Sequence, residues 1–331
     1  QLSSDRVAFQ NDPKSFYELS HRLYKKLLPE SIQARVEKGE ILDLTIVPDA
    51  VLNVCAFDAL LTQKDVKGTV PYLIHKANIS YTYSIVSLQY QKQLKNENNK
   101  NVLSVIPVFE AQERGLATLE YSTYEKSNMP TLHSQLLLKE QATRRAFLSN
   151  FKDFKVLHFS THAEADSAQI PRIEFIDSTL FLPEIYGLPL QNDLVVLSAC
   201  QTAIGTENSG EGLMSLARAF AYAGAPSLVA SLWKVNNKST SDLMTAFYRH
   251  LNDDHSKSAA LRQAKLDYLS EASIAQQSPY YWSGMIFMGA DDVVAFERTI
   301  PIHFWLLGLG VLLLLGFLVF SLISNSLSKK T

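Results

Sequence analysis

The sequence predicts an α/β fold in which helices flank a largely parallel sheet. Apolar runs of strand length alternate along the chain with segments of helical period, as expected when helices connect parallel strands. In addition, several runs, such as Leu194–Ala199, are apolar almost without interruption, which is typical of strands that are buried on both faces. Together, the two patterns predict a sheet with helices on both sides.

The expected elements follow one another in the order that such a fold requires. The predicted strands are Leu42–Pro48, Val102–Phe109, Lys155–Ser160, Leu194–Ala199, Ser227–Trp233 and Tyr281–Met288. The predicted helices are Gln141–Asn150, Glu211–Ala223, Ser239–Leu251 and Ser256–Leu269. In the second helix, apolar residues recur at intervals of three and four and give one face that can pack on the sheet.

The two ends of the chain differ from this body. Residues 1–40 are polar with a helical pattern, and because residue 1 is Gln, we expect the chain to be a piece of a longer protein. Residues Ile302–Ile323 carry no charged side chain, and about 20 such residues cross a bilayer as a helix. Trp305 and the pair Lys329 and Lys330 flank this run, as is typical of membrane interfaces. The sequence therefore predicts a single-pass membrane protein, with a buried core helix as the alternative and the side of the membrane left open.

Bulk composition narrows the class of partner. The formal net charge is −2, which gives no basic surface for neutralising phosphates and argues against nucleic acid as the main partner. The two cysteines, Cys55 and Cys200, are too few for a disulfide framework. A lone cysteine in a chain of this size is a candidate nucleophile, so each has to be considered in its context.

Two predicted strands end in residues that can carry chemistry. VLHFSTH brings His162 to the carboxyl end of one strand, and LVVLSAC brings Cys200 to the end of another. Sites in parallel sheets form at this edge, and an imidazole can deprotonate a nearby thiol for attack on a carbonyl. The small, polar residues after Cys200 leave backbone N–H groups available for an oxyanion. On these grounds alone, a buried apolar cysteine and a structural histidine remain the alternative.

Four segments carry a resemblance to a known family: HFSTHA, LSACQTAIG, GEGLMSLARAFAYAGAPSLVASLWKVNNKST and SPYYWSGMIFMG. From about Leu42 to Gly289, the chain resembles the CHAT family of caspase-like cysteine peptidases. The resemblance implies a caspase-haemoglobinase fold, His162 as general base, Cys200 as nucleophile, and no obligate third catalytic residue or cofactor. It further implies that His158 is structural, and no third ligand stands at a zinc-like spacing, so no metal is expected.

The resemblance also suggests how the chain is divided. The expected parts are a helical segment or linker at 1–40 that follows missing repeats, a degenerate half at 41–140, an active peptidase half at 141–298, a transmembrane helix at 299–326 and a basic tail at 327–331. Relatives commonly act as triggered proteases in bacterial signalling or defence. Some release gasdermin-like pore-forming proteins, and many carry helical repeats that act as sensors before the peptidase.

One residue departs from the family pattern. Members usually carry Gly directly after the catalytic His, where its N–H joins that of the Cys in the oxyanion hole, whereas this chain has Ala163. If that position requires a positive φ, a side chain there is strained. The alternative to an active endopeptidase is therefore a catalytically impaired, membrane-anchored scaffold that binds protein partners. A small-molecule acyltransferase finds no support, because no Gly-rich phosphate loop follows a strand.

Five residues are candidates for substrate binding. Ser198, two before the Cys, stands where related peptidases often place a charge, and a neutral Ser predicts no strong charge selection. Glu164 and Asp166 either provide a negative wall that favours Lys or Arg in the substrate, or are loop acids exposed to solvent. Trp233 walls the groove or packs at the sheet end, and Asn236 lies near the same rim.

Overall fold

The computed structural model describes residues 9, 11–66, 68–94, 98–110, 113–116, 119, 123–125, 129–164, 170–198, 209–297 and 316, with backbone only for Glu164 and residues 209–215. The described residues up to Phe296 belong to one compact unit. The other unit, Glu297–Thr331, is described only at Glu297 and Gly316.

Within the described residues, eight strands form one sheet in the order β1-β2-β11-β10-β9-β5-β3-β4. Their bounds are β1 Leu42–Ile46, β2 Ala77–Tyr81, β3 Lys100–Ile106, β4 Gln135–Leu138, β5 Phe154–Phe159, β9 Leu194–Leu197, β10 Ser227–Ser231 and β11 Met285–Gly289. All neighbouring pairs are parallel except β10 and β11. The prediction of a largely parallel sheet is therefore confirmed.

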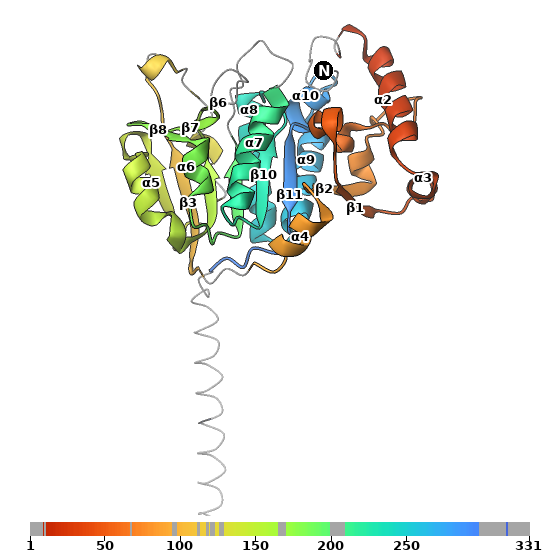
Figure 1. The fold of residues 1–331 in the computed structure, drawn as a ribbon. Coiled ribbons are helices and arrows are strands. Elements are labelled where there is room, and N and C mark those ends of the chain that lie inside the picture. The colour runs from red at the N-terminus through yellow and green to blue at the C-terminus, as the bar shows by residue number, and fades with distance from the viewer. Residues whose placement is uncertain are drawn as a thin grey trace, which may run out of the picture. The chain divides into compact units, whose positions relative to one another are not determined.

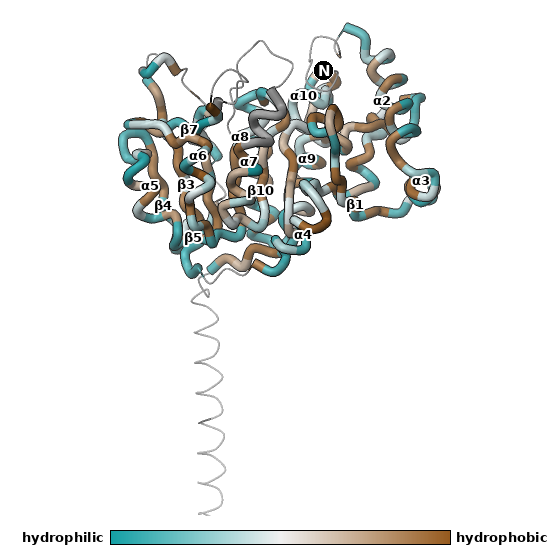
Figure 2. The backbone as a smooth tube through the Cα atoms, in the orientation of Figure 1, coloured by the Kyte–Doolittle hydropathy of each residue, from teal (hydrophilic) through white to brown (hydrophobic). Residues whose placement is uncertain are grey.

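Helices cover both faces of this sheet (Figure 1). They are α2 Pro13–Leu27, α3 Glu30–Glu37, α4 Ile85–Gln91, α5 Arg144–Asn150, α6 Leu182–Tyr186, α7 Ser209–Tyr222, α8 Asn237–Asn252, α9 Lys257–Glu271 and α10 Pro279–Trp282. α7 packs beside α6 on one face, and α8 packs against α9 on the other. Every residue of β5, β9, β10 and β11 is consequently buried, which explains their continuous apolar sequence. Figure 2 shows the same contrast, with apolar strands inside and polar loops at the borders.

The predicted elements lie close to the observed ones, with one difference at the end of the chain. The segment Tyr281–Met288 does not form a single strand: β11 begins only at Met285, and Pro279–Trp282 form the short helix α10. Pro279 at the first helical position has the φ that a helix start requires, and Ser283 closes the turn. The remaining predicted strands and helices differ from the observed ones by a few residues at their ends.

The N-terminal segment forms the helices that its pattern predicts. Asp12 caps α2 by accepting the Ser15 N–H at 3.1 Å. Phe16 is buried, and Ser20 donates its hydroxyl to the Ala59 carbonyl at 3.1 Å. α2 therefore docks onto the residues that follow β1, and the boundary at residue 40 remains a prediction.

The segment 41–140 contributes to both edges of the sheet. β1 and β2 pair next to β11 at one edge, whereas β3 and β4 pair next to β5 at the other. The strands expected in the degenerate half thus flank those expected in the active half. The boundary at 140 remains a prediction about ancestry and function.

The prediction of a single-pass membrane protein is corrected. Among the described residues, no helix is both long and apolar enough to cross a membrane. The longest, α8, has 16 residues and so spans about 24 Å at 1.5 Å per residue, short of the ~30 Å hydrocarbon core. It is also amphipathic, since one face packs on the sheet and the other carries charged residues. The segment Ile302–Ile323, on which the prediction was based, lies outside the described residues except for Gly316.

Candidate active site

The two strands that lead to the predicted dyad are parallel neighbours. In their register, His158 of β5 lies opposite Val196 of β9, and Phe159 lies opposite Leu197. Positions 162 and 200 each follow the end of their strand by three residues in the sequence, and the two strands end at the same edge of the sheet. Cys200 itself lies outside the described residues.

His162 is fixed from both its backbone and its ring. It is 1% exposed, and its carbonyl oxygen accepts the backbone N–H of Glu174 at 3.0 Å. The hydroxyl of the preceding residue, Thr161, donates to the Glu174 carbonyl at 2.6 Å. The ring packs against that of Phe109, with 5.5 Å between centroids. The imidazole therefore has a defined position without any help from a bound substrate.

Ala163 begins a small antiparallel sheet, which consists of β6 Ala163–Glu164, β7 Arg172–Glu174 and β8 Thr179–Phe181. Ala163 pairs with Ile173, and the bond from Glu174 N–H to His162 C=O makes this a pair without mutual hydrogen bonds. The Ala163 N–H thus points away from β7. Ala163 is not among the described non-glycine residues with positive φ, so its Cβ meets no left-handed strain.

A buried polar network lies among the strands just before the dyad. His158 Nε2 is 2.8 Å from Glu125 Oε2, and His158 Nδ1 is 3.0 Å from the Tyr248 hydroxyl. Ser198 donates its hydroxyl to the same Glu125 oxygen at 2.5 Å. His158, Ser198 and Glu125 are all less than 5% exposed. The network joins β5, β9 and α8 to Glu125, which comes from the connection between β3 and β4.

The hydrogen bonds of this network can be assigned a consistent direction. Burial, together with the charge of Glu125, raises the pKa of Tyr248 well above its ordinary value, so its hydroxyl keeps its proton and can donate to His158 Nδ1. His158 Nε2 then carries the ring proton and donates to Glu125. Glu125 accepts from both His158 and Ser198. These contacts place His158 in a structural role, as the resemblance implies.

A second polar cluster holds β7 in place. The side chain of Glu174 is 5% exposed and accepts from Arg114 at 2.7 Å and from Arg172 at 2.9 Å. Arg114 also donates to the Thr179 hydroxyl at 2.8 Å and to the carbonyls of Phe175 and Ser178. Since Glu174 bonds the backbone of His162, Arg114 is linked to the dyad through a single residue.

The other predicted binding residues are placed as follows. Trp233 is buried and donates its indole N–H to the Tyr280 carbonyl at 3.3 Å, and its ring lies against Gly284. Asn236 caps α8 by accepting the Ser239 N–H at 3.1 Å. The side chain of Glu164 and the whole of Asp166 lie outside what the structure describes. The structure thus brings His162, Ala163 and Ser198 to one edge of the sheet.

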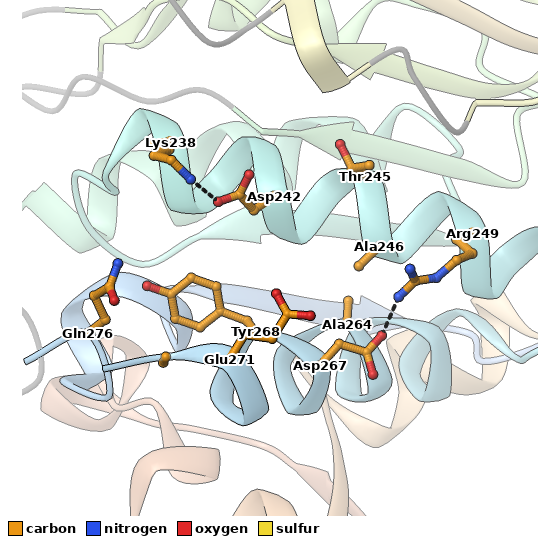
Figure 3. Close-up of a pocket in the computed structure, with 11 residues that line it drawn as sticks. Lys238, Asp242, Thr245, Ala246, Arg249, Ala264, Asp267, Tyr268, Glu271 and Gln276 are labelled. Carbon is orange, nitrogen blue, oxygen red and sulfur yellow. Dashed lines mark hydrogen bonds and ion pairs between the residues drawn. The ribbon is translucent and has the colours of Figure 1, made fainter. Parts of the chain in front are cut away.

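A separate groove of about 420 Å³ lies between α8 and α9 (Figure 3). Asp242 pairs with Lys238 at 2.7 Å, and Asp267 pairs with Arg249 at 2.6 Å. None of the residues that line it belongs to the strand ends described above. Its cations are already matched by acids of the same helices, so it offers no strong charge to a ligand.

The described residues contain no group of three or more His, Cys, Asp or Glu placed to hold a metal ion. Comparison with known proteins gives the family. The sequence model of the CHAT domain matches residues 17–290, which is most of the chain.

The chain belongs to the CHAT domain family.

Curated relatives match a shorter part of this CHAT protein. It is 34% identical over 108 residues to tetratricopeptide repeat protein 28 of Mus musculus, and 32% identical over the same length to that of Homo sapiens. Each match covers 33% of this chain but 4% of the relative. The chain therefore spans a small fraction of these relatives.

Among solved structures, the complex of the pro- and mature domains of RgpB from Porphyromonas gingivalis has a TM-score of 0.50 at 10% identity, covering 88% of this chain and 78% of that one. The separase–securin complex of Saccharomyces cerevisiae has a TM-score of 0.49 at 14% identity, covering 75% and 15%. At the identity to RgpB, the likeness shows the fold alone. With the family match, it identifies the fold of the CHAT domain as caspase-like.

Sequence reasoning missed Glu125, Arg114 and Tyr248. Glu125 lies 73 residues before Ser198 and 33 before His158, in a segment without periodic pattern, so no local signal could place it. Tyr248 lies on the buried face of α8 and reads as an ordinary apolar residue. The one available hint was His158 itself, because a histidine in a fully buried strand requires polar partners.

Proposed function

We propose that this CHAT domain is a cysteine endopeptidase that uses Cys200 as nucleophile and His162 as general base. The observation that supports it most is the parallel pairing of β5 and β9, because the two strands end at the same edge of the sheet, three residues before His162 and three residues before Cys200 in the sequence. A thiol and an imidazole that meet at such an edge are suited to acyl transfer. The family match and the fold favour a peptidase over another kind of thiol enzyme.

In the proposed reaction, His162 takes the thiol proton of Cys200, and the thiolate attacks the carbonyl carbon of the scissile peptide. The resulting oxyanion is bound by the backbone N–H groups of Ala163 and Cys200. The bond to the amine breaks as His162 returns the proton to the leaving nitrogen. Water then attacks the thioester, with His162 as base, and releases the new carboxylate and the thiol.

The orientation of Ala163 supports its part in this proposal. Its N–H takes no part in the ladder with β7, and its φ is not positive, so an alanine fits where relatives usually carry glycine. A catalytically impaired scaffold therefore gains no support from this residue and is the outcome against which the proposal is tested.

For substrate selection, we propose that Ser198 imposes no charge preference, because its hydroxyl is neutral, and that its burial and its bond to Glu125 hold it away from the substrate. Glu164 and Asp166 are retained as acids that favour Lys or Arg before the cut. We propose that Trp233 and Asn236 form the rim of the substrate groove. Trp233 would act through its packing, and Asn236 through its cap on α8.

We further propose that the substrate and the trigger are proteins. The match to tetratricopeptide repeat protein 28 supports a helical-repeat sensor in the same polypeptide, since the name of that relative describes such repeats. A signalling or defence role, with a gasdermin-like or other effector as substrate, follows from the resemblance to triggered bacterial peptidases.

The proposal is tested by covalent labelling and by mapping of cleavage sites. The full chain is incubated with a panel of acyloxymethyl ketones that differ in the residue next to the reactive group, and labelling is compared with Cys200→Ala and His162→Ala. We expect labelling of wild type that both variants lose, and new protein N-termini that appear only with wild type. A folded wild type that is labelled by no member of the panel would argue for the scaffold.

A further inference from the structure

The connection between β3 and β4 contributes three side chains to the surroundings of the dyad. Phe109, Arg114 and Glu125, called here the connection residues, come from a stretch that belongs to neither catalytic strand. Each makes a different contact near His162 or near the strand that leads to Cys200. None of the three was a candidate from the sequence, and the proposed reaction does not use them.

Glu125 bridges the two catalytic strands. It accepts from His158 on β5 at 2.8 Å and from Ser198, directly after β9, at 2.5 Å. His158 lies four residues before His162, and Ser198 lies two residues before Cys200. One carboxylate is therefore bonded to both strand ends, four residues before His162 and two residues before Cys200. Its 3% exposure means that water cannot replace either bond.

Arg114 acts on the other side of His162. Its guanidinium donates to the Glu174 carboxylate, the Thr179 hydroxyl and two carbonyls of the turn between β7 and β8. Glu174 in turn holds the His162 carbonyl. The backbone of Arg114 is left-handed, with φ 56° and ψ 19°, a conformation that costs a non-glycine residue about 1 kcal/mol or more. Such a conformation persists only where the surrounding bonds enforce it.

Phe109 completes the set by packing its ring against that of His162. It is fully buried and lies three residues after the end of β3, just as His162 lies three residues after the end of the adjacent strand β5. The ring contact limits rotation of the imidazole about its side-chain bonds. The connection residues thus reach the ring of His162, its backbone and the strand ends.

We propose that Phe109, Arg114 and Glu125 are positioning residues that hold His162, and the strand end that leads to Cys200, in the arrangement that the reaction needs, an inference that rests on the proposed peptidase function. For Arg114 and Glu125, a structural role alone would be served better by apolar packing, because buried ionic groups contribute little net stability. A positioning role requires the directional bonds that are present. Whatever displaces this connection will therefore lower the reactivity of the dyad before it unfolds the domain.

The inference is tested in the full chain with Glu125→Gln, Arg114→Ala, Arg114→Lys and Phe109→Leu, using the acyloxymethyl ketone that labels wild type fastest. A misplacement of about 1 Å lowers the rate about 100-fold, so we expect kinact to fall 10- to 100-fold while KI stays within about twofold. Arg114→Lys should recover part of the loss, because it keeps the charge at Glu174. Arg249→Ala, which breaks a more exposed Arg–carboxylate pair in the groove of Figure 3, is the control and should keep the wild-type rate.

A second measurement does not depend on activity. In hydrogen exchange, peptides that cover 158–164 and 172–176 should exchange faster in the Glu125 and Arg114 variants, while α9 remains as in wild type. Where wild type is labelled, unchanged kinact in all four variants overturns the inference and leaves the peptidase function standing. Where wild type is unreactive, the peptidase function fails and this inference fails with it, whereas exchange still shows whether the connection residues order the segment around His162. A rise spread over the whole chain indicates a purely structural role and also overturns it.

Discussion

The backbone N–H of Glu174 donates to the carbonyl oxygen of His162 at 3.0 Å. The Thr161 hydroxyl donates to the Glu174 carbonyl at 2.6 Å. Glu174 of β7 is therefore bonded both to His162 and to the residue before it. The position of the proposed base is thus set by the small sheet β6-β7-β8 as well as by β5. Substitutions within this small sheet should therefore change the position of His162 and report on the proposed catalysis.

Ala163→Gly should leave activity almost unchanged. The φ of Ala163 is not positive, so removing its Cβ relieves no strain and its N–H keeps its direction. Because glycine in a strand is less stable than alanine by about 0.5–1 kcal/mol, the variant should lose stability by that amount. Urea unfolding and the labelling rate measure the two effects. A labelling rate more than about fivefold above wild type would contradict this account, because it would show that the methyl group obstructs the oxyanion site.

Ser198→Ala should lower stability without changing the preference for the residue before the cut. The hydroxyl donates to the buried Glu125 carboxylate, so its removal leaves an acceptor with one partner fewer, at a cost of about 1–3 kcal/mol. Cleavage of a peptide library that varies the residue before the cut would measure the preference. A new preference for acidic or basic residues in the variant would place the Ser198 hydroxyl in the substrate pocket instead.

The sheet was predictable where strands are buried on both faces, because their apolar runs need no knowledge of neighbours. β5, β9 and β10 were found for this reason. β2 was not predicted, because its middle three residues are only partly buried and its sequence, ANISY, shows no apolar run. β4 and the strands of the small sheet have only two to four residues each, too few for a period to appear.

The site was predictable only in its positions along the chain. Strand ends and the family resemblance together pointed to His162 and Cys200 as candidates, whereas the surroundings of His162 depend on contacts between residues that are far apart in sequence. Arg114 lies 60 residues before Glu174, and Tyr248 lies 90 residues after His158. A pair of this kind has no spacing rule, so the connection residues emerge only from the folded chain. The candidate binding role of Trp233 rested on position alone and gave no information on its packing against Gly284.

Lys265→Met should destabilise the domain strongly. Lys265 on α9 forms a buried ion pair with Asp58, and both side chains are less than 10% exposed. Removing one partner leaves a buried charge unmatched, which costs about 3–5 kcal/mol in the free energy of unfolding. The double variant Asp58→Asn with Lys265→Met should recover most of this loss. Lys238→Met, which breaks the exposed pair with Asp242, is the control and should cost less than about 1 kcal/mol.

The same ion pair predicts the sign of a pH effect. Burial raises the pKa of Asp58, and Lys265 partly offsets this. In Lys265→Met the offset is lost, so the folded chain binds the Asp58 proton more tightly than the unfolded chain does. The tighter proton binding stabilises the folded variant. This stabilisation is fully present below the unfolded pKa of about 3.9 and is lost as pH rises through the raised folded pKa of Asp58. The deficit of the variant should therefore be smaller at pH 5 than at pH 8 in chemical unfolding, and an equal deficit at both would contradict the assignment.

The thiol of Cys55 should be nearly inert in the folded chain. Burial, with a smaller contribution from the charge of Asp58, raises the pKa of this thiol to about 11. Because only the thiolate alkylates, the rate with iodoacetamide at pH 8 should be roughly 100-fold below that of a free cysteine and should rise about tenfold per pH unit up to pH 10. The Cys200→Ala variant leaves Cys55 as the single thiol, so mass spectrometry can follow it alone, with the guanidinium-unfolded chain as the reference for full reactivity. Fast alkylation of the folded variant at pH 8 would show that the Cys55 thiol is reactive. Labelling of wild type could then be assigned to Cys200 only by comparison with the Cys200→Ala variant.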